Sequence, residues 1–459
     1  MPFAMCLRSG SDRGAYHANG RLNTMQMVDY SERDLDMSSD IPRYADSTLF
    51  EILPYLPAIM IDGAKGVGKT HTAKRFAQTV VQLDKKSERI ALANDYDRLY
   101  RETPPILLDE WQYLPEVWDR VRRMVDDGIS LGSIILTGSI QSKDPTLHSG
   151  AGRIVRMRMR PLSLAERIQQ PPLITLKECL EGSIPEKIDG KSPFKYEDYM
   201  NEVVRSGFPF IYQTNEEVRT RHLNSYVDNI INREFTKQGV RVRQPGKLLN
   251  WMQAYAAATG TTTSYNKMLD AATAGEDDKP TKETTIAYRE ALRSLWLIDE
   301  LPCWGEGENL FGRLKQTPKH YLADPALEAR LLRLSAHDLI TGIANTPHDP
   351  EYGSIAGRLF ESLCIMSLRT YAASLDADVE YLRTGNGTHE IDAIVQKDQS
   401  IVAIEVKMAA YITDTDVRHL NWFEEKVGTR VKEKIILTTG DRAYRRPDRV
   451  LVVPAALFG

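Results

Sequence analysis

The sequence predicts an α/β protein with a parallel sheet near the amino end and a second α/β unit near the carboxyl end. An apolar run at 59–61 ends at a glycine-rich loop, and a helical stretch follows over 70–83. Two more apolar runs, at 106–108 and 133–136, end in polar residues, and three strand-like runs follow a helical stretch in the last third. Strands that alternate with helices favour a parallel sheet.

Length and composition indicate a soluble protein of several domains. The 459 residues, 42% hydrophobic and 27% charged, exceed one ordinary core and suit about two to four domains. No apolar run approaches the roughly 18 residues of a membrane span, and the start lacks the apolar core of a signal peptide. We therefore expect a cytoplasmic protein with no membrane partner. A net charge of −4 excludes a uniformly basic coat for nucleic acid, so any DNA contact must be local.

The first 40 residues are expected to form a disordered leader. They are polar and lack a sustained hydrophobic period. Met25 or Met27 is an alternative start. Ordered structure is expected from Pro42, with a helix over 47–53 and, after the glycine-rich loop and its helix, a strand over 89–93.

The strongest motif lies within 58–72, AIMIDGAKGVGKTHT. It matches G-x-x-x-x-G-K-[ST], the phosphate-binding P-loop, at every fixed position. Glycines let backbone N–H groups turn onto phosphate oxygens, and the next helix presents its positive end to the same anion. Lys69 is expected to reach the β- and γ-phosphates of ATP, and Thr70 to bind Mg²⁺. The expected nucleotide contacts are Gly63, Ala64, Lys65, Gly66, Val67, Gly68, Lys69, Thr70 and His71.

The apolar run that ends in Asp109 and Glu110 is the second landmark of an ATPase. Asp109 is expected to hold Mg²⁺ through water, and Glu110 to polarise the water that attacks the γ-phosphate. The next apolar run ends at Thr137 and Ser139. Because the open ends of parallel strands line the nucleotide crevice, both are candidate sensors of the γ-phosphate, and Ser139 joins the expected catalytic set.

Arg153 opens the alternating run RIVRMRMR. Its period of two favours a strand with one apolar and one basic face. Arg153 is a candidate arginine finger, acting in cis or on a neighbouring subunit of a homo-oligomer. The alternative is a solvated or structural arginine.

The order of these motifs resembles the prokaryotic AAA+-like P-loop ATP-binding proteins with a C-terminal restriction-endonuclease-like domain of unknown function. The resemblance is carried by GAKGVGKT, LLDEWQ, ILTGS, GRI with PLSLAER, SGFPF and YVDNIINREF, and covers about residue 42 to the end. Lys65 stands where arginine is common in that family. The resemblance implies an ATPase core over 41–165, a helical lid over 166–247, a winged-helix segment over 248–320 and a restriction-endonuclease-like α/β domain over 321–459. The turn at 207–209 is then either a contact to the base or ribose or a plain loop of the lid.

The implied winged-helix segment has helical stretches over 248–258, from 264 and over 284–296. The stretch 281–293 would be its recognition helix. It contains the basic residues Lys282, Arg289 and Arg293, and the acidic residues Glu283 and Glu290 reduce its positive charge. We favour a structural role for this segment over base reading.

The last third of the sequence carries a second group of candidate catalytic and metal-binding residues. Asp392, twelve residues and then Glu405-x-Lys407 match the PD-(D/E)xK nuclease pattern, and Glu361 on the helix expected over 355–371 is its usual fourth member. Strands are expected over 379–382, 389–395 and 401–407. Since Glu405 and Lys407 share one face of a strand, Glu361, Asp392 and Glu405 are expected to hold a second Mg²⁺ or a Mn²⁺ while Lys407 activates water. Glu390 is a further candidate ligand.

Two functions remain open from the sequence. In the first, ATP hydrolysis drives or gates a nuclease-like domain that acts on DNA. In the second, the protein is an ATP-switched binding or signalling module whose nuclease fold is catalytically silent and docks DNA or a protein partner.

Overall fold

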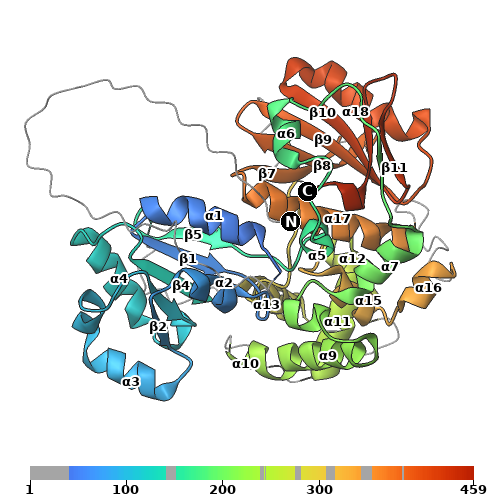
Figure 1. Ribbon diagram of the computed structural model, residues 1–459. Coiled ribbons are helices and arrows are strands. Elements are labelled where there is room, and N and C mark those ends of the chain that lie inside the picture. The colour runs from blue at the N-terminus through green and yellow to red at the C-terminus, as the bar shows by residue number, and fades with distance from the viewer. Residues whose placement is uncertain are drawn as a thin grey trace, which may run out of the picture. The chain divides into compact units, whose positions relative to one another are not determined.

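The computed structural model describes residues 41–140, 151–237, 242, 244–273, 281–305, 316–342, 354–384 and 387–459 (Figure 1). The expected disordered leader, 1–40, lies outside these residues. Contacts group Ile41–Gly459 into one unit.

The amino-terminal part is a parallel sheet with helices on both faces. Its five described strands run in the order β2-β3-β4-β1-β5. They are β1 (Ala58–Asp62), β2 (Thr79–Gln82), β3 (Ile106–Asp109), β4 (Ile134–Gly138) and β5 (Val155–Arg158), with helices α1 (Tyr44–Ile52), α2 (Lys69–Phe76), α3 (Lys86–Asn94) and α4 (Glu116–Asp126). Along β1, Ile59 and Ile61 join the core that includes α1 and α2, whereas Met60 joins the core that includes α4. The sheet is therefore buried on both faces, as the apolar runs predict.

The region after the P-loop differs from the prediction. The helix expected over 70–83 ends at Phe76, and 79–82 form β2, which pairs with β3 from Thr79 and Ile106 onward. The expected strand over 89–93 is wrong, because 86–94 form α3. The β-branched TVV run suits the edge of a sheet, whereas the Ala, Leu, Arg and Glu residues of 88–93 are good helix formers.

The expected lid over 166–247 is divided between two cores. Its described helices are α5 (Leu164–Ile168), α6 (Leu176–Glu181), α7 (Tyr196–Arg205), α8 (Pro209–Tyr212), α9 (Glu216–Asn229) and α10 (Phe235–Lys237), with a π-helical turn over Ile230–Glu234. Buried side chains of α6 and α7, such as Cys179 and Tyr199, pack in the carboxyl-terminal core. Leu223 and Val227 of α9 pack instead with the P-loop core. Each helix follows the core that buries its apolar face, and the assignment of this segment as a lid stays a prediction.

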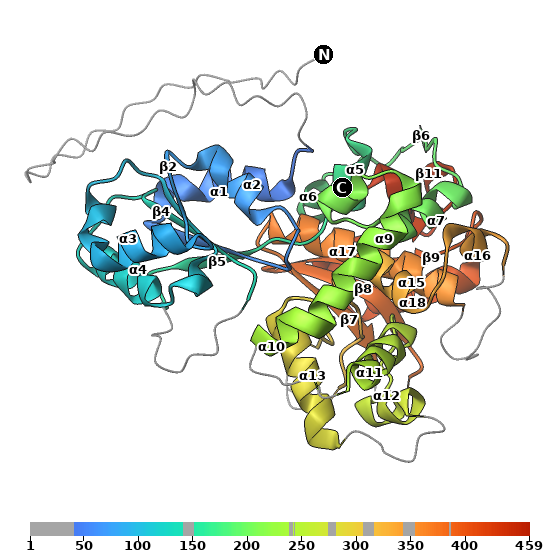
Figure 2. The same ribbon diagram turned by 90° about the horizontal axis from the view of Figure 1, so that it is seen from below.

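Three helices follow: α11 (Pro245–Ala257), α12 (Tyr265–Ala272) and α13 (Lys282–Ser294). They lie together in the lower part of Figure 2. Short antiparallel bridges then join Ile298 to Leu322 and Leu301 to Lys319. The helices occur where the sequence predicts them, and the assignment of this segment as a winged helix stays a prediction.

The carboxyl-terminal part is a mixed sheet whose seven described strands run in the order β6-β11-β12-β10-β9-β8-β7. The strands are β6 (Gly190–Lys191), β7 (Asp378–Arg383), β8 (Glu390–Lys397), β9 (Ser400–Lys407), β10 (Val431–Thr438), β11 (Arg442–Arg445) and β12 (Leu451–Pro454). The helices are α15 (Pro325–Leu331), α16 (Ala336–Ile340), α17 (Ile355–Ala373) and α18 (Asp414–Val427). Helix α17 packs on one face and α18 on the other. The expected helix 355–371 and the three expected strands are confirmed.

An ion cluster around the buried Asp299 joins the amino-terminal sheet to helix α17. Arg158 of β5 contacts the Asp299 carboxylate at 2.8 Å, Arg160 at 2.7 Å and Arg369 of α17 at 2.9 Å. Although burial opposes ionisation, the three guanidinium groups hold the pKa of Asp299 well below its usual range. Because Arg158 stands beside Asp62, the last residue of β1, this cluster connects the strand before the P-loop to α17.

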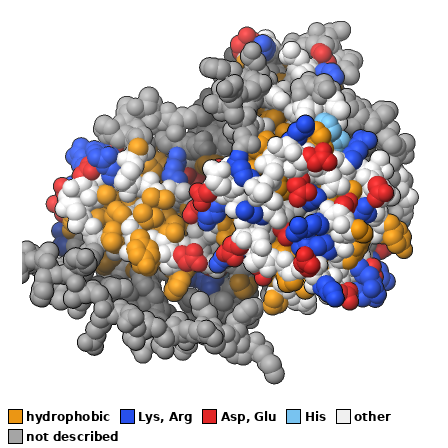
Figure 3. All heavy atoms as spheres, turned by 90° about the horizontal axis from the view of Figure 1, so that it is seen from above, with side chains coloured by type: hydrophobic (Ala, Val, Ile, Leu, Met, Phe, Trp, Pro, Cys, Tyr) orange, Lys and Arg blue, Asp and Glu red, His pale blue; other side chains and the backbone are white. Residues whose placement is uncertain are grey.

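One exposed face of the amino-terminal part is apolar. Hydrophobic side chains gather on the left of the surface in Figure 3. Phe50 of α1 and Tyr55, just after that helix, are 58% and 76% exposed. Apolar surface of this kind is typical of an interaction site.

No helix among the described residues is long and apolar enough to cross a bilayer.

Candidate functional site

The loop 63–68 leaves β1 and enters α2 at Lys69. Gly63, Gly66 and Gly68 have φ angles of +152°, +89° and +103°. A Cβ atom on Gly63 would lie 2.2 Å from the carbonyl oxygen of Met159. The course of the loop therefore requires glycine, and it leads directly into the positive end of a helix, where phosphate groups bind.

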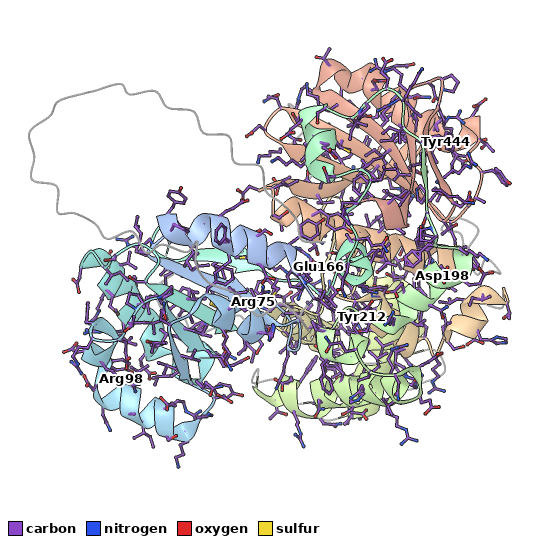
Figure 4. All side chains as sticks on the ribbon, viewed as in Figure 1. Arg75, Arg98, Glu166, Asp198, Tyr212 and Tyr444 are labelled. Atoms are coloured by element: carbon purple, nitrogen blue, oxygen red, sulfur yellow. The ribbon has the colours of Figure 1, made fainter. Side chains whose placement is uncertain are left out.

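Side chains distant in the sequence hold this loop. Arg43 donates a hydrogen bond to the carbonyl of Val67 at 2.8 Å and forms an ion pair at 3.0 Å with Glu166 on α5 (Figure 4). Tyr226 of α9 donates to the carbonyl of Lys65 at 2.9 Å, and its ring packs on Phe208 at 4.8 Å between centroids. The turn at 207–209 thus supports the loop, and its contact to a base or ribose stays a prediction.

Lys69 is buried at the start of α2. Its ammonium group donates to the carbonyls of Gly63 at 2.8 Å and Ala64 at 3.0 Å. Burial lowers the pKa of Lys69 to about 8, against the opposing pull of Glu110 and other nearby carboxylates. Since its direct partners are neutral carbonyls, the ammonium can exchange them for phosphate oxygens.

Thr70 and Asp109 meet at the end of the loop. The Thr70 hydroxyl donates to Asp109 Oδ1 at 2.6 Å, and the Thr137 hydroxyl from β4 donates to the same atom at 2.6 Å. Oxygen atoms of a hydroxyl and a carboxylate are the ligands that Mg²⁺ prefers. Because the partners of this carboxylate are hydroxyl groups, the pair fits the magnesium site that the sequence predicts.

Glu110 follows Asp109 in a left-handed conformation, with φ of 55°. Its Oε2 atom accepts hydrogen bonds from Ser139 at 3.0 Å and from Gln112, and its own N–H donates to Thr137 at 3.2 Å. The structure therefore brings Ser139 to Glu110, and the expected role of Ser139 as a sensor of the γ-phosphate stays a prediction. Gln112 was missed, although it stands only two residues after Glu110.

The remaining loop residues differ in exposure. Ala64 and Val67 are buried, whereas the Lys65 side chain is 62% exposed and forms an ion pair with Glu234 at 3.4 Å. His71 is exposed on α2. Their contacts to nucleotide stay predictions.

Arg153 lies away from the P-loop. It precedes β5, whose Val155 pairs with Ile59 near the start of β1, whereas the P-loop follows the end of β1. Its side chain forms an ion pair with Asp126 of α4 at 2.9 Å. This position does not favour the expected arginine finger in cis. Arg153 and the P-loop lie near opposite ends of β1 and are separated by the length of that strand. A finger toward a neighbouring subunit stays a prediction.

The carboxyl-terminal motif residues do converge. Glu361, Asp392, Glu405 and Lys407 line one pocket of about 480 Å³, together with Lys319. Glu361 comes from α17, Asp392 from β8, and Glu405 and Lys407 from β9. These four residues were expected together from the sequence, whereas Lys319, Arg358, Asp416, Arg418 and His419 also line the pocket and were not expected there.

Lys319 occupies the centre of the acidic cluster. Its Nζ atom lies 3.0 Å from Glu361, 2.9 Å from Glu390 and 2.9 Å from Asp392, and the residue is 2% exposed. Although burial alone lowers the pKa of a lysine, the carboxylates of Asp392 and Glu361 raise the pKa of Lys319 well above its ordinary value. One buried ammonium thus pairs with three carboxylates and offsets part of their negative charge.

Glu405 pairs with Lys407 rather than with Lys319. The two side chains are 2.7 Å apart, and Glu405 Oε2 has no hydrogen-bond partner among the described residues. Burial and the charge of Asp392 raise the pKa of Glu405 to about 8. The same two causes raise the pKa of Glu361 to about 7.

The cluster does not fit the expected second metal ion as it stands. Within the described ranges, no group of three or more His, Cys, Asp or Glu side chains is arranged to hold a metal. The ammonium group of Lys319 already occupies the position between the carboxylates that a metal ion would take. It belongs to neither sequence motif, so only its tertiary contacts reveal it.

Comparison with family models assigns three regions. Residues 56–168 match the model of an AAA domain. This part of the chain is an AAA domain. Residues 196–338 and 356–458 match two domains of unknown function, DUF8612 and DUF4143 respectively. The nuclease-like fold of the carboxyl-terminal part therefore stays a prediction.

Three solved structures resemble the chain weakly. The Walker-type ATPase PABY2304 of Pyrococcus abyssi is 15% identical with a TM-score of 0.38, over 64% of this chain and 96% of that one. The replication initiator DnaA bound to AMPPCP and single-stranded DNA is 16% identical with a TM-score of 0.24, over 54% and 87%. Drosophila ORC bound to DNA is 12% identical with a TM-score of 0.20, over 63% and 94%. These TM-scores are too low to bear on function. A comparison with curated proteins finds no significant match.

Proposed function

We propose that the AAA domain binds ATP with Mg²⁺ and hydrolyses it. The observation that carries the proposal is the 2.6 Å contact between Thr70 and Asp109 beside the glycine loop, with Glu110 on the next residue. The phosphate-binding loop, a pair of hard oxygen ligands and a second carboxylate then lie at the carboxyl ends of β1 and β3 in one parallel sheet. This is the set of groups that phosphoryl transfer to water requires.

Each side chain has one task in this proposal. Lys69 moves from the loop carbonyls to the β- and γ-phosphate oxygens, while Thr70 and Asp109 hold Mg²⁺. The bound ion supplies neutralisation of the phosphate charge. Glu110, oriented by its hydrogen bonds to Ser139 and Gln112, accepts a hydrogen bond from the attacking water and polarises it.

A glutamine substitution at position 110 tests the proposal. Glu110→Gln keeps the size of the side chain and removes its charge, so ATP binding is retained while turnover falls by about 100-fold or more. Phosphate release and equilibrium binding measure the two effects separately. Glu116→Gln, an exposed change at the start of α4, is the matched control. A loss of less than about tenfold in the Glu110 variant would identify another residue as the base.

For the carboxyl-terminal domain we propose a docking role, switched by the ATP cycle, with DNA as the candidate partner and a protein as the alternative. Lys319 supports this role, because its ammonium group occupies the position among the carboxylates that a metal ion and its bound water would need. The Asp299 cluster supports the coupling, since Arg158 adjoins β1 and Arg369 lies on the same helix as Glu361.

DNA cleavage is the second candidate function, supported by the convergence of Asp392, Glu405 and Lys407 in one pocket. The two candidates differ in one assay. Purified protein is incubated with plasmid and Mg²⁺ or Mn²⁺, with and without ATP, beside a Lys407→Ala variant. If the domain only docks DNA, the plasmid should stay intact with the wild type and with Lys407→Ala. Nicking by the wild type that disappears in Lys407→Ala would establish the nuclease instead.

A further inference from the structure

A pocket of about 330 Å³ opens among α11, α12 and α13, separate from both sites above. Its walls include Trp251 on α11, Ser264 and Asn266 at the start of α12, and Lys282 and Arg289 on α13. The volume lies at the lower end of the range for small-ligand sites. It is enough for one small ligand or one unit of a polymer.

The charged side chains that line this pocket are all cations, as far as the described residues show. Lys282 is exposed and forms no ion pair with another described residue. Arg289 contacts Glu290 at 3.3 Å, but Glu290 does not line the pocket. A small cavity with two cationic walls favours an anionic ligand.

Arg289 is held in a defined orientation. Its guanidinium carbon lies 4.5 Å from the centre of the Tyr265 ring, and the Tyr265 hydroxyl donates a hydrogen bond to Glu300. Stacking on an aromatic ring limits the motion of the guanidinium group, so its binding to a ligand costs less entropy. A fixed guanidinium plane presents paired N–H donors that match two oxygens of one phosphate.

Trp251 gives the pocket a mainly apolar wall. The residue is 1% exposed, and its indole N–H, which has almost no accessible surface, finds no hydrogen-bond acceptor among the described residues. The donors that a ligand can reach are therefore those of Ser264, Asn266, Lys282 and Arg289.

We propose that this pocket binds a phosphate group of a nucleotide unit, with Lys282 and Arg289 on the phosphate oxygens. Phosphate supplies several acceptors to a wall of donors, and Ile286 and Trp251 provide an apolar surface for the attached sugar or base. A strand of DNA and a free nucleotide share this chemistry. The site is distinct from the P-loop and is not part of ATP hydrolysis.

The test measures binding of a short fluorescent single-stranded DNA, without a terminal phosphate, to the full chain by anisotropy. Lys282→Ala and Arg289→Lys should each weaken binding several-fold. Lys282→Ala should also reduce the salt dependence of log K by about 0.7 for each phosphate that the variant no longer neutralises. Arg289→Lys keeps the charge and the fold while removing the planar donor pair. Lys267→Ala, an exposed lysine of α12 outside the pocket, is the matched control and should bind normally.

A second set of proteins separates the sources of phosphate. Lys69→Ala removes the P-loop ammonium and, in the absence of ATP, should bind the DNA strand as the wild type does in the absence of ATP. In that background AMP is titrated with and without Lys282→Ala. If Lys282→Ala lowers the affinity for AMP but not the affinity for DNA, the pocket still binds phosphate and its ligand is a free nucleotide. If neither DNA nor AMP responds to the Lys282 and Arg289 variants, or if Lys267→Ala weakens binding equally, the proposal is overturned.

Discussion

The P-loop site and the carboxyl-terminal pocket contain the same kinds of residue, yet their lysines are anchored differently. Lys69 donates to the carbonyls of Gly63 and Ala64, which leaves Asp109 to hydroxyl partners. Lys319 instead contacts several carboxylates directly. Acidic side chains therefore face hydroxyl groups in the first region and a buried ammonium group in the second. The position of one ammonium group decides between the two.

The largest effect is expected at the P-loop lysine. Lys69→Ala should lower ATP turnover by about 100-fold or more, because it removes the positive charge expected on the β- and γ-phosphates. Steady-state phosphate release measures it, and the thermal unfolding midpoint checks the fold. Lys65→Ala, an exposed lysine of the same loop, should retain most of the activity. Equal turnover in the Lys69 variant and the wild type would remove the P-loop from the mechanism.

A smaller but substantial effect is expected at the other lysine. Lys319→Met leaves buried carboxylates without their cation, so the free energy of unfolding should fall by about 3–5 kcal/mol in the absence of metal. Urea denaturation measures it, with Lys407→Met, a partly exposed lysine of the same pocket, as the milder control.

The same variant sharpens the comparison when Mn²⁺ is added. If Lys319 takes the place of a cation, Mn²⁺ should restore part of the lost stability in Lys319→Met and leave the wild type unchanged. Calorimetric titration should likewise show heat only in the variant. Heat in the wild type that is lost in Asp392→Asn would show instead that the pocket binds metal beside Lys319.

The smallest effect is expected from Ser139→Ala. This change removes one of two hydrogen bonds to Glu110 Oε2, and Gln112 retains the other. Turnover at saturating ATP should fall only a few-fold, whereas the double variant with Gln112→Ala should lose considerably more, because residues that act on one group are not additive. A loss in Ser139→Ala as large as in Glu110→Gln would assign Ser139 a direct contact with the γ-phosphate.

Local patterns were enough for much of the fold and of the first site. The glycine spacing requires the loop at 63–68, and the apolar runs before Asp109 and Thr137 each form a buried strand of one parallel sheet. Such features depend on residues that are close together in the sequence, so glycine spacing and hydrophobic periodicity are enough to predict them. The helix at 86–94 was missed because its apolar residues are too few to distinguish a short helix from a strand.

The contacts that set the chemistry join residues far apart in the chain, and these required the folded structure. Lys319 stands 42 residues before Glu361 and 73 before Asp392, so no local period could place its ammonium among them. The support of the P-loop by Arg43 and Tyr226, and the division of 166–237 between two cores, have the same origin. Charge neutralisation and burial depend on distance in space, and a motif specifies only distance along the chain.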